Sequence, residues 1–236
     1  MREVIQISAK NVGSVALPDF CPRCFWMRQR VRNKLPFQIF PGIFSSIDAY
    51  TKRVVHGWFD ELGAPPNWLA DLGDVTGYVD PPHHTKYRFY VDDLDIMLTG
   101  SPDGILTMGD ASHVIIDYKT ARFTATQDKL HPMYETQLNV YAMIGEHRGL
   151  APVSGLALVY AEPVTDDVTA SQAANRRPEG FAMPFDVKML PVTLDAGIVR
   201  PLLEKTRAIF DLPSAPVGAS GCQDCEKLEA LMSVAT

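Results

Sequence analysis

The sequence lacks any apolar run close to the roughly 20 residues that a membrane-spanning helix needs. Its first residues, MREVIQISAKNVG, also lack the apolar core of a secretory signal peptide. These two absences argue against membrane insertion and export. We therefore expect a soluble, intracellular protein of the cytoplasm with no membrane partner.

An excess of positive charge is also lacking. The 236 residues include 22 Lys and Arg against 28 Asp and Glu, which gives a formal net charge of −6. A protein that coats nucleic acid usually presents a broad positive field, so the composition argues against that class. Arg28, Arg30 and Arg32 lie close together and are compatible with a local basic patch or with a solvated helix face.

Cysteine is scarce, but its spacing is informative. The four cysteines form two CxxC pairs, Cys21 with Cys24 and Cys222 with Cys225. In a cytosolic protein such pairs indicate a metal or cluster site more than disulfides. The ligand chemistry alone is compatible with a tetrahedral zinc site and with an iron-sulfur cluster.

The hydrophobic pattern predicts helices in the first third of the chain. Ser8 is a candidate N-cap for a short helix, and a second helix is expected over residues 24–31. Ser45 or Ser46 is a candidate N-cap for a long helix that ends near Gly63. Its expected core-facing stripe consists of Ile47, Tyr50, Val54, Trp58 and Leu62.

The remainder of the chain predicts strands followed by further helices and strands. Residues 64–86 are expected to form a loop. Short apolar runs at 87–91, 96–99, 105–108 and 113–118 predict an antiparallel meander. A helix over 132–147, strands over 155–161 and 181–190, and a helix over 194–210 complete the pattern. We expect a single α/β domain over residues 1–236, with a mixed central sheet flanked by helices.

The residues that could perform chemistry lie between Gly100 and Lys119. The β-branched triplet before Asp117 suits a buried strand, and Asp117 and Lys119, two residues apart, share one face of that strand. Asp103 lies in a Pro-Asp-Gly turn. Each element alone is a weak signal, but a hairpin between them would bring the two carboxylates together.

Two converging carboxylates repel each other unless a cation joins them. Oxygen ligands favour Mg²⁺ or Mn²⁺, which can activate water and neutralise charge on a phosphate. A neighbouring lysine can position the water or stabilise the transition state. The pattern is the one expected for phosphodiester hydrolysis.

These elements resemble the PD-(D/E)xK nuclease superfamily and, within it, the RecB-type exonuclease branch. Ser-Pro-Asp103-Gly and Ile-Asp117-Tyr-Lys119-Thr are similar to its G-x-x-D and D-x-K elements. Gln137 and Tyr141 are similar to the branch's Q-x-x-x-Y signature, and His56 to a histidine that the branch contributes from an upstream helix. The resemblance implies a restriction-endonuclease-like core.

The resemblance also implies roles for individual residues. His56, Asp103 and Asp117 would be metal ligands together with the backbone carbonyl of Tyr118, and Lys119 would be the catalytic lysine. Gln137 and Tyr141, four residues apart on one helical face, would line the site and contact DNA or orient the lysine.

Some RecB-like nucleases, including CRISPR-associated ones, hold a 4Fe-4S cluster with cysteines from both ends of the domain. By that resemblance Cys21, Cys24, Cys222 and Cys225 would bind such a cluster. The usual arrangement is one N-terminal and three C-terminal cysteines, whereas this chain has two and two, so Zn²⁺ remains an alternative. Either metal would clasp residues 1–40 to residues 212–236 and form a helical subregion.

The expected function is that of a Mg²⁺- or Mn²⁺-dependent DNase, an exonuclease acting on single-stranded DNA or DNA ends. Recombination, repair or CRISPR adaptation would be its setting, with the proteins of such complexes as partners. Arg28, Arg30 and Arg32 are candidates for phosphate contacts. The alternative is a catalytically silent module in which the nuclease fold binds DNA or a protein partner.

Overall fold

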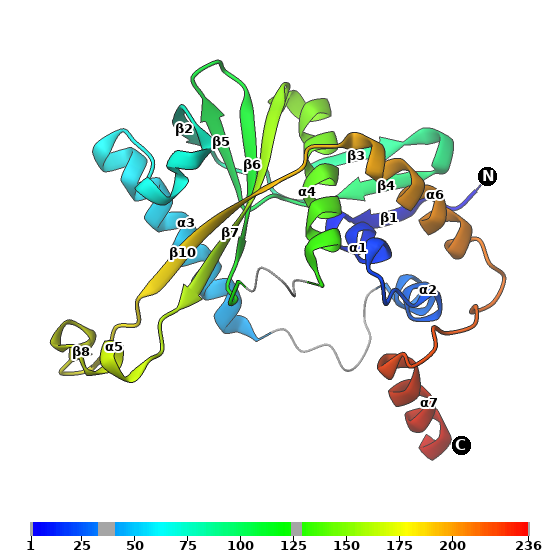
Figure 1. The fold of residues 1–236 in the computed structure, drawn as a ribbon. Coiled ribbons are helices and arrows are strands. Elements are labelled where there is room, and N and C mark those ends of the chain that lie inside the picture. Colours follow the sequence, from blue (N-terminus) through cyan, green and yellow to red (C-terminus); the bar gives the residue numbers. More distant parts are fainter. Residues whose placement is uncertain (1, 33–40, 124–128, 236) are drawn as a thin grey trace.

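The computed structural model describes residues 2–32, 41–123 and 129–235. A mixed five-stranded sheet lies at its centre, with helices on both faces (Figure 1). The strands run in the order β10, β7, β6, β5, β2, and only β6 and β7 pair in parallel. Their bounds are β2 Val75–Val79, β5 Gly104–Met108, β6 His113–Lys119, β7 Val153–Pro163 and β10 Phe185–Val192. The expected α/β class with a mixed central sheet is therefore confirmed.

A second sheet of three strands lies beside the first. It contains β1 (Ile5–Ser8), β4 (Ile96–Thr99) and β3 (Arg88–Val91), with β4 in the middle. The expected meander is therefore wrong in one respect, because β3 and β4 belong to one sheet and β5 and β6 to the other. Pro102 lies in the connection between β4 and β5, and proline has no N–H to continue a ladder.

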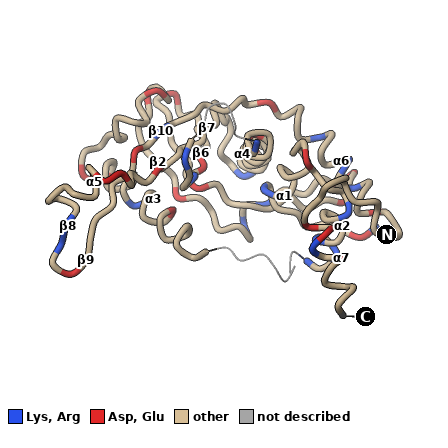
Figure 2. The backbone as a smooth tube through the Cα atoms, turned by 60° about the horizontal axis from the view of Figure 1, so that its bottom comes forward, with Lys and Arg blue, Asp and Glu red and all other residues tan. Residues whose placement is uncertain are grey.

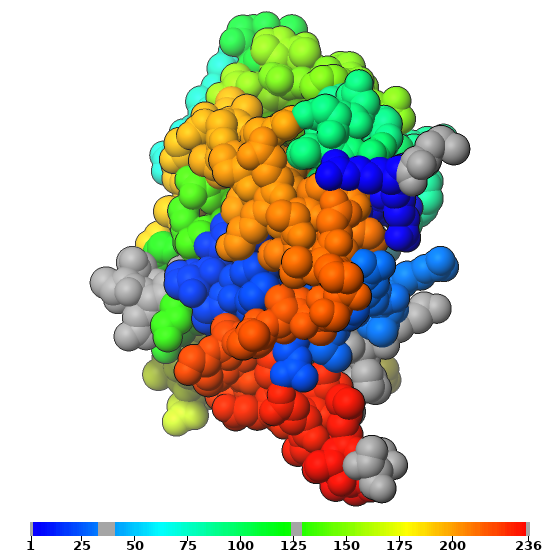
Figure 3. Space-filling view, turned by 90° about the vertical axis from the view of Figure 1, so that its right-hand side faces the viewer, coloured from blue at the N-terminus to red at the C-terminus, as the bar shows by residue number. Residues whose placement is uncertain are grey.

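The helices fall into two layers and a terminal group. Helix α4 covers one face of the large sheet and α3 covers the other (Figure 1). Helices α1 and α2 lie near the C-terminal α6 and α7, and Figure 3 shows the C-terminal residues against the N-terminal ones. The bounds are α1 Ala9–Gly13, α2 Pro22–Arg30, α3 Gly42–Leu62, α4 His131–Gly145, α6 Val199–Phe210 and α7 Gln223–Ala235.

A projecting arm extends from the far ends of β7 and β10. It carries the short elements α5 (Asp167–Ser171), β8 (Arg176–Arg177) and β9 (Gly180–Phe181) (Figure 1). None of the described helices combines the length and apolarity needed to cross a bilayer.

Side chains alternate along β6 between the face covered by α3 and the face covered by α4. Val114, Ile116 and Tyr118 pack with Val55 and Phe59 of α3 in one apolar cluster. Ile115 belongs to the other cluster, which contains most of the buried apolar residues of α4. Because side chains two apart share a face, Asp117 and Lys119 lie on the α4 side of the sheet.

Helix α3 differs from its expected form in two ways. It begins at Gly42 after Pro41, not at Ser45 or Ser46, although it ends as expected at Gly63, which has a left-handed φ of 65°. The expected core-facing stripe is also wrong, since Tyr50 and Leu62 are 64% and 63% exposed.

The expected stripe is wrong because α3 carries apolar residues on two sides and buries the side with fewer of them. Val55 and Phe59 face the sheet, and Asp48 and Lys52 continue the same face toward the N-terminal end of the helix. A stripe judged by hydrophobicity alone therefore points to the wrong side.

Three further boundaries differ from expectation. Residues 64–86 are not all loop, because they contain a 3-10 helix at Asn67–Leu72 and the edge strand β2, which pairs with β5. Strand β10 and helix α6 begin later than expected, at Phe185 and Val199. Ser8 caps α1 as expected, since its hydroxyl accepts a hydrogen bond from the Asn11 N–H at 3.3 Å.

The subregion predicted from residues 1–40 and 212–236 is described only in part. Residues 33–40 lie outside the described residues, as does Thr236. The four cysteines of the two segments lie together, as expected. The assignment of 1–236 to one domain stays a prediction.

Because α1 packs closely on α4, replacing a glycine by alanine should have opposite effects on stability in α1 and in α3. A Cβ at Gly13 would lie 2.3 Å from the backbone oxygen of Met133, whereas a Cβ at Gly57 of α3 would meet no atom within 4 Å. Gly13→Ala should lower the free energy of unfolding by about 1–3 kcal/mol. Gly57→Ala should raise it by about 0.5–1 kcal/mol, because alanine is the better helix former. Urea denaturation of both variants checks this, and equal effects would contradict the packing.

Candidate active site

A cleft of about 520 Å³ lies where β6 ends and α4 begins. Its walls come from α1, α3, α4 and the β6 end, and its polar residues include Asp48, Asp103, Asp117 and Lys119. Figure 2 shows acidic and basic residues mixed along the chain, with both kinds near β6. The sequence-predicted carboxylates and lysine are thus brought together in one place.

The hairpin between β5 and β6 brings the two predicted carboxylates together. Its register pairs Gly104 with Ile116, which sets Asp103 next to Asp117 at the open end. The Tyr118 N–H donates to Asp103 Oδ2 at 2.9 Å and fixes that carboxylate against β6. The expected convergence is therefore present.

Asp117 and Lys119 form an ion pair on the α4 side of the sheet. Asp117 is only 3% exposed. Burial and, next, the nearby Asp103 charge raise the pKa of Asp117 to about 7, although Lys119 acts in the opposite direction. Such a carboxyl releases its proton readily only when a cation compensates for its charge.

Helix α4 supplies residues that hold this ion pair in place. The Gln137 amide donates to Asp117 Oδ1 at 3.2 Å and to the Tyr141 hydroxyl at 3.0 Å. The Lys119 ammonium lies over the Tyr134 ring, 4.2 Å from its centroid. Gln137 and Tyr141 line the cleft, and the Gln137 amide contacts the carboxylate. Their predicted roles, contact with DNA or orientation of the lysine, stay predictions.

Two residues of α3 that the sequence reasoning missed also belong to the site. The Lys52 ammonium is 3.1 Å from Asp103 Oδ1 and 3.2 Å from Asp48 Oδ2, so it bridges two carboxylates. Burial and the nearby Asp103 charge raise the pKa of Asp48. The available signal was their spacing, because an acid and a base four residues apart share a helix face.

His56 lies one turn beyond Lys52, and the structure places its ring against Tyr78 of β2. The two ring centroids are 3.9 Å apart and the rings are nearly parallel. His56 is not among the residues that line the cleft. Its predicted role as a metal ligand stays a prediction, and Asp48 is the carboxylate among the α3 residues that line the cleft.

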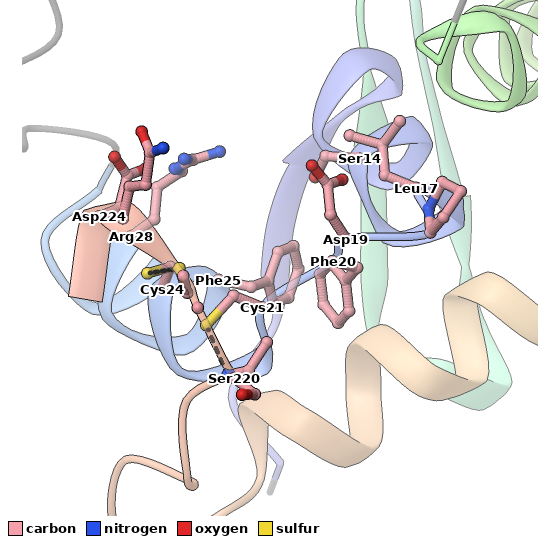
Figure 4. A pocket seen from close by; sticks show the side chains of 15 residues that line it. Ser14, Leu17, Asp19, Phe20, Cys21, Cys24, Phe25, Arg28, Ser220 and Asp224 are labelled. Carbon is pink, nitrogen blue, oxygen red and sulfur yellow. Dashed lines mark hydrogen bonds between the residues drawn. The ribbon is translucent and has the colours of Figure 1, made fainter. Parts of the chain in front are cut away.

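The three arginines proposed for phosphate contacts lie on and after α2. Arg30 donates to the Phe210 carbonyl at 2.7 Å and lies over the Phe210 ring, so it joins α2 to α6. Arg28 lines a hollow beside the cysteines (Figure 4), and Arg32 follows α2 with a positive φ of 51°. Their contact with DNA remains a prediction.

The oxygen atoms that line the cleft suit a divalent cation. Asp48 Oδ1 and Gln137 Oε1 are buried and have no hydrogen-bond partner in the described part of the chain. Carboxylate and carbonyl oxygens are the ligands that Mg²⁺ and Mn²⁺ prefer. The residues that would hold such an ion are Asp103, Asp117, Asp48 and the Tyr118 carbonyl.

The comparisons with known proteins agree with this geometry. The family model of the PD-(D/E)XK nuclease superfamily matches residues 49–228, well over half of the chain. The chain belongs to the PD-(D/E)XK nuclease superfamily. Its members are generally nucleases that use divalent metals and act on nucleic acid.

Two further comparisons add little. No curated protein matches the chain. One matching solved structure, titled "Crystal structure of SSO0001", is 15% identical, covers 92% of this chain and 90% of its own, and has a TM-score of 0.45. A likeness this distant does not bear on function. The superfamily is confirmed, while the RecB-type branch and a CRISPR association stay predictions.

The raised pKa of Asp117 predicts how metal affinity depends on pH. Below about pH 7 this carboxyl is protonated and must lose its proton before it can bind a cation. Mn²⁺ affinity should therefore rise about tenfold between pH 6 and pH 8. Calorimetric titration in two buffers of different ionisation enthalpy would measure both the affinity and the released proton. A flat affinity with no proton release would contradict the assignment.

The position of Asp48 predicts a contrast within α3. Asp48→Ala should weaken Mn²⁺ binding by about tenfold or more, because it removes a carboxylate from the cleft wall. His56→Ala should leave the affinity within about twofold, because its ring packs on Tyr78. A larger loss of Mn²⁺ affinity in His56→Ala than in Asp48→Ala would instead show that the histidine predicted from the motif is the ligand.

Proposed function

We propose that the chain is a Mg²⁺- or Mn²⁺-dependent deoxyribonuclease that hydrolyses phosphodiester bonds. The observation that carries the proposal is the convergence of Asp103, Asp117 and Lys119 in one cleft. The superfamily match supports nuclease activity at the general level.

The chain's own residues have distinct tasks in this proposal. Asp103 and Asp117 would hold the ion, which would supply water activation and neutralise charge on the phosphate. Gln137 orients Asp117 through its amide. Lys119, seated over Tyr134, presents a fixed positive charge that positions the attacking water or stabilises the transition state.

Lys52 balances the acidic residues on the α3 side. The site holds Asp48, Asp103 and Asp117 against the ammonium groups of Lys10, Lys52 and Lys119, which leaves a formal charge of zero. One divalent ion would make the site net positive. A positive site attracts the phosphate of a nucleic acid.

The cleft wall favours single strands or DNA ends as the substrate. Phe44, Leu130, Met133 and Tyr134 give it an apolar and aromatic side. Unpaired bases stack on such side chains, whereas bases within a duplex are already stacked on one another. Exonuclease action and a role in recombination, repair or CRISPR adaptation, with protein partners, are proposed from the motif resemblance.

A digestion panel tests the proposal. End-labelled single-stranded, duplex and circular DNA would be incubated with Mg²⁺ or Mn²⁺. We expect release of nucleotides from single-stranded DNA or from DNA with free ends, and little cleavage of circular DNA. Asp103→Asn and Lys119→Met should each lower the rate by about 10²-fold or more.

A matched control variant is Asp71→Asn, because Asp71 is an exposed carboxylate outside the cleft. It should cleave at the wild-type rate. Wild-type protein that binds DNA but cleaves none of the substrates would instead support the catalytically silent binding module.

A further inference from the structure

The four cysteines lie at the starts of two helices from opposite ends of the chain. Cys21 is the N-cap of α2 and Cys24 lies in its first turn. Cys222 directly precedes α7 and Cys225 lies in its first turn. Helix N-termini carry partial positive charge, which stabilises thiolates. The cluster therefore has the electrostatic setting of a thiolate metal site.

The sulfur atoms are close together without being bonded. Cys21 and Cys225 Sγ are 3.5 Å apart, Cys24 and Cys222 Sγ 3.6 Å, and Cys24 and Cys225 Sγ 3.3 Å. All four sulfurs lie within 4.8 Å of one another. A disulfide needs about 2.05 Å. A tetrahedral ion with metal–sulfur bonds of about 2.3 Å separates its sulfurs by about 3.8 Å.

A 4Fe-4S cluster, which the family resemblance implies, does not fit this spacing. Each thiolate of such a cluster binds a different iron at a corner of the cage, so the sulfurs are spread to roughly 6 Å from one another. A hollow of about 600 Å³ opens beside Cys21 and Cys24 (Figure 4), and Cys222 also lines it. All four sulfurs nevertheless lie within 4.8 Å of one another and are not spread around the hollow.

We propose that Cys21, Cys24, Cys222 and Cys225 hold one tetrahedral Zn²⁺ ion and not a 4Fe-4S cluster. Thiolates prefer Zn²⁺ among the common divalent ions, and four of them form a closed structural site. This inference is independent of the proposed nuclease function.

The loop before α7 supports a compact site. A Cβ at Gly218 would lie 2.9 Å from Cys225 Sγ, so only glycine lets the backbone pass this close. The Ala219 N–H donates to Cys21 Sγ at 3.3 Å. Backbone N–H groups directed at ligand sulfurs orient those sulfurs toward the metal.

Helix α7 needs the ion because it has little else to hold it. Cys225 is the only buried residue among those of α7 whose burial is described. Leu231 and Val234 are 45% and 88% exposed. The ion pair between Arg23 and Glu229 is at the surface, where water screens the charges and such pairs stabilise little. Zinc would therefore supply most of the anchorage of α7 on α2.

Metal analysis of the 236-residue chain tests the proposal. The protein would be expressed in medium with both iron and zinc, purified without oxygen, and assayed for metals and acid-labile sulfide. We expect one zinc per chain, no sulfide and a colourless solution, and Co²⁺ exchange should produce the visible absorption of a tetrahedral thiolate site. Four irons with four sulfides, or a metal-free chain, would overturn it.

Variants separate this site from the catalytic one. The double variant Cys222→Ser with Cys225→Ser should lose the zinc, whereas Asp103→Asn, the control, should keep one zinc per chain. Zinc retained by the double variant would overturn the assignment. Because zinc content does not depend on DNA cleavage, the two proposals fail separately.

Limited proteolysis tests the anchorage. Removal of zinc from the wild-type chain should speed cleavage in residues 213–222 by about tenfold or more, because α7 then detaches. An unchanged cleavage rate after zinc removal would overturn the anchoring role.

Discussion

The structure depends on holding two mutually repelling carboxylates side by side. The β5–β6 hairpin sets Asp103 against Asp117, and burial makes their repulsion strong. The surrounding side chains compensate for this charge, since Lys52 pairs with Asp103 and Lys119 pairs with Asp117. The helices on the two faces of the sheet both supply partners for these carboxylates. Helix α3 provides Lys52 for Asp103, and α4 provides Gln137 for Asp117.

Part of this site followed from the sequence by local geometry. The period of a strand places Asp117 and Lys119 on one face, and the β5–β6 hairpin brings Asp103 beside Asp117 at its open end. The helical spacing of Gln137 and Tyr141 was informative for the same reason. Asp48 and Lys52 were not found because their role depends on how α3 sits on the sheet. The apolar residues of α3 suggested a different face, about 100° around the helix, and helix rotation is a tertiary property that hydrophobic periodicity alone does not determine.

The chain separates two kinds of metal chemistry in space. Oxygen ligands gather at the end of β6, where a labile divalent ion would do chemistry. Sulfur ligands gather where α2 meets α7, where a tightly held ion would join the ends of the chain. The paired cysteines were evident in the sequence, but the sulfur spacing that favours one ion over a cluster required the structure.

Asp103 and Asp117 should together form one divalent-metal site. An anomalous difference map from a crystal grown with Mn²⁺ would locate the ion. We expect a manganese peak about 2.2 Å from a carboxylate oxygen of each of these residues. A well-ordered cleft with both carboxylates in place and no peak between them, at saturating Mn²⁺, would contradict it.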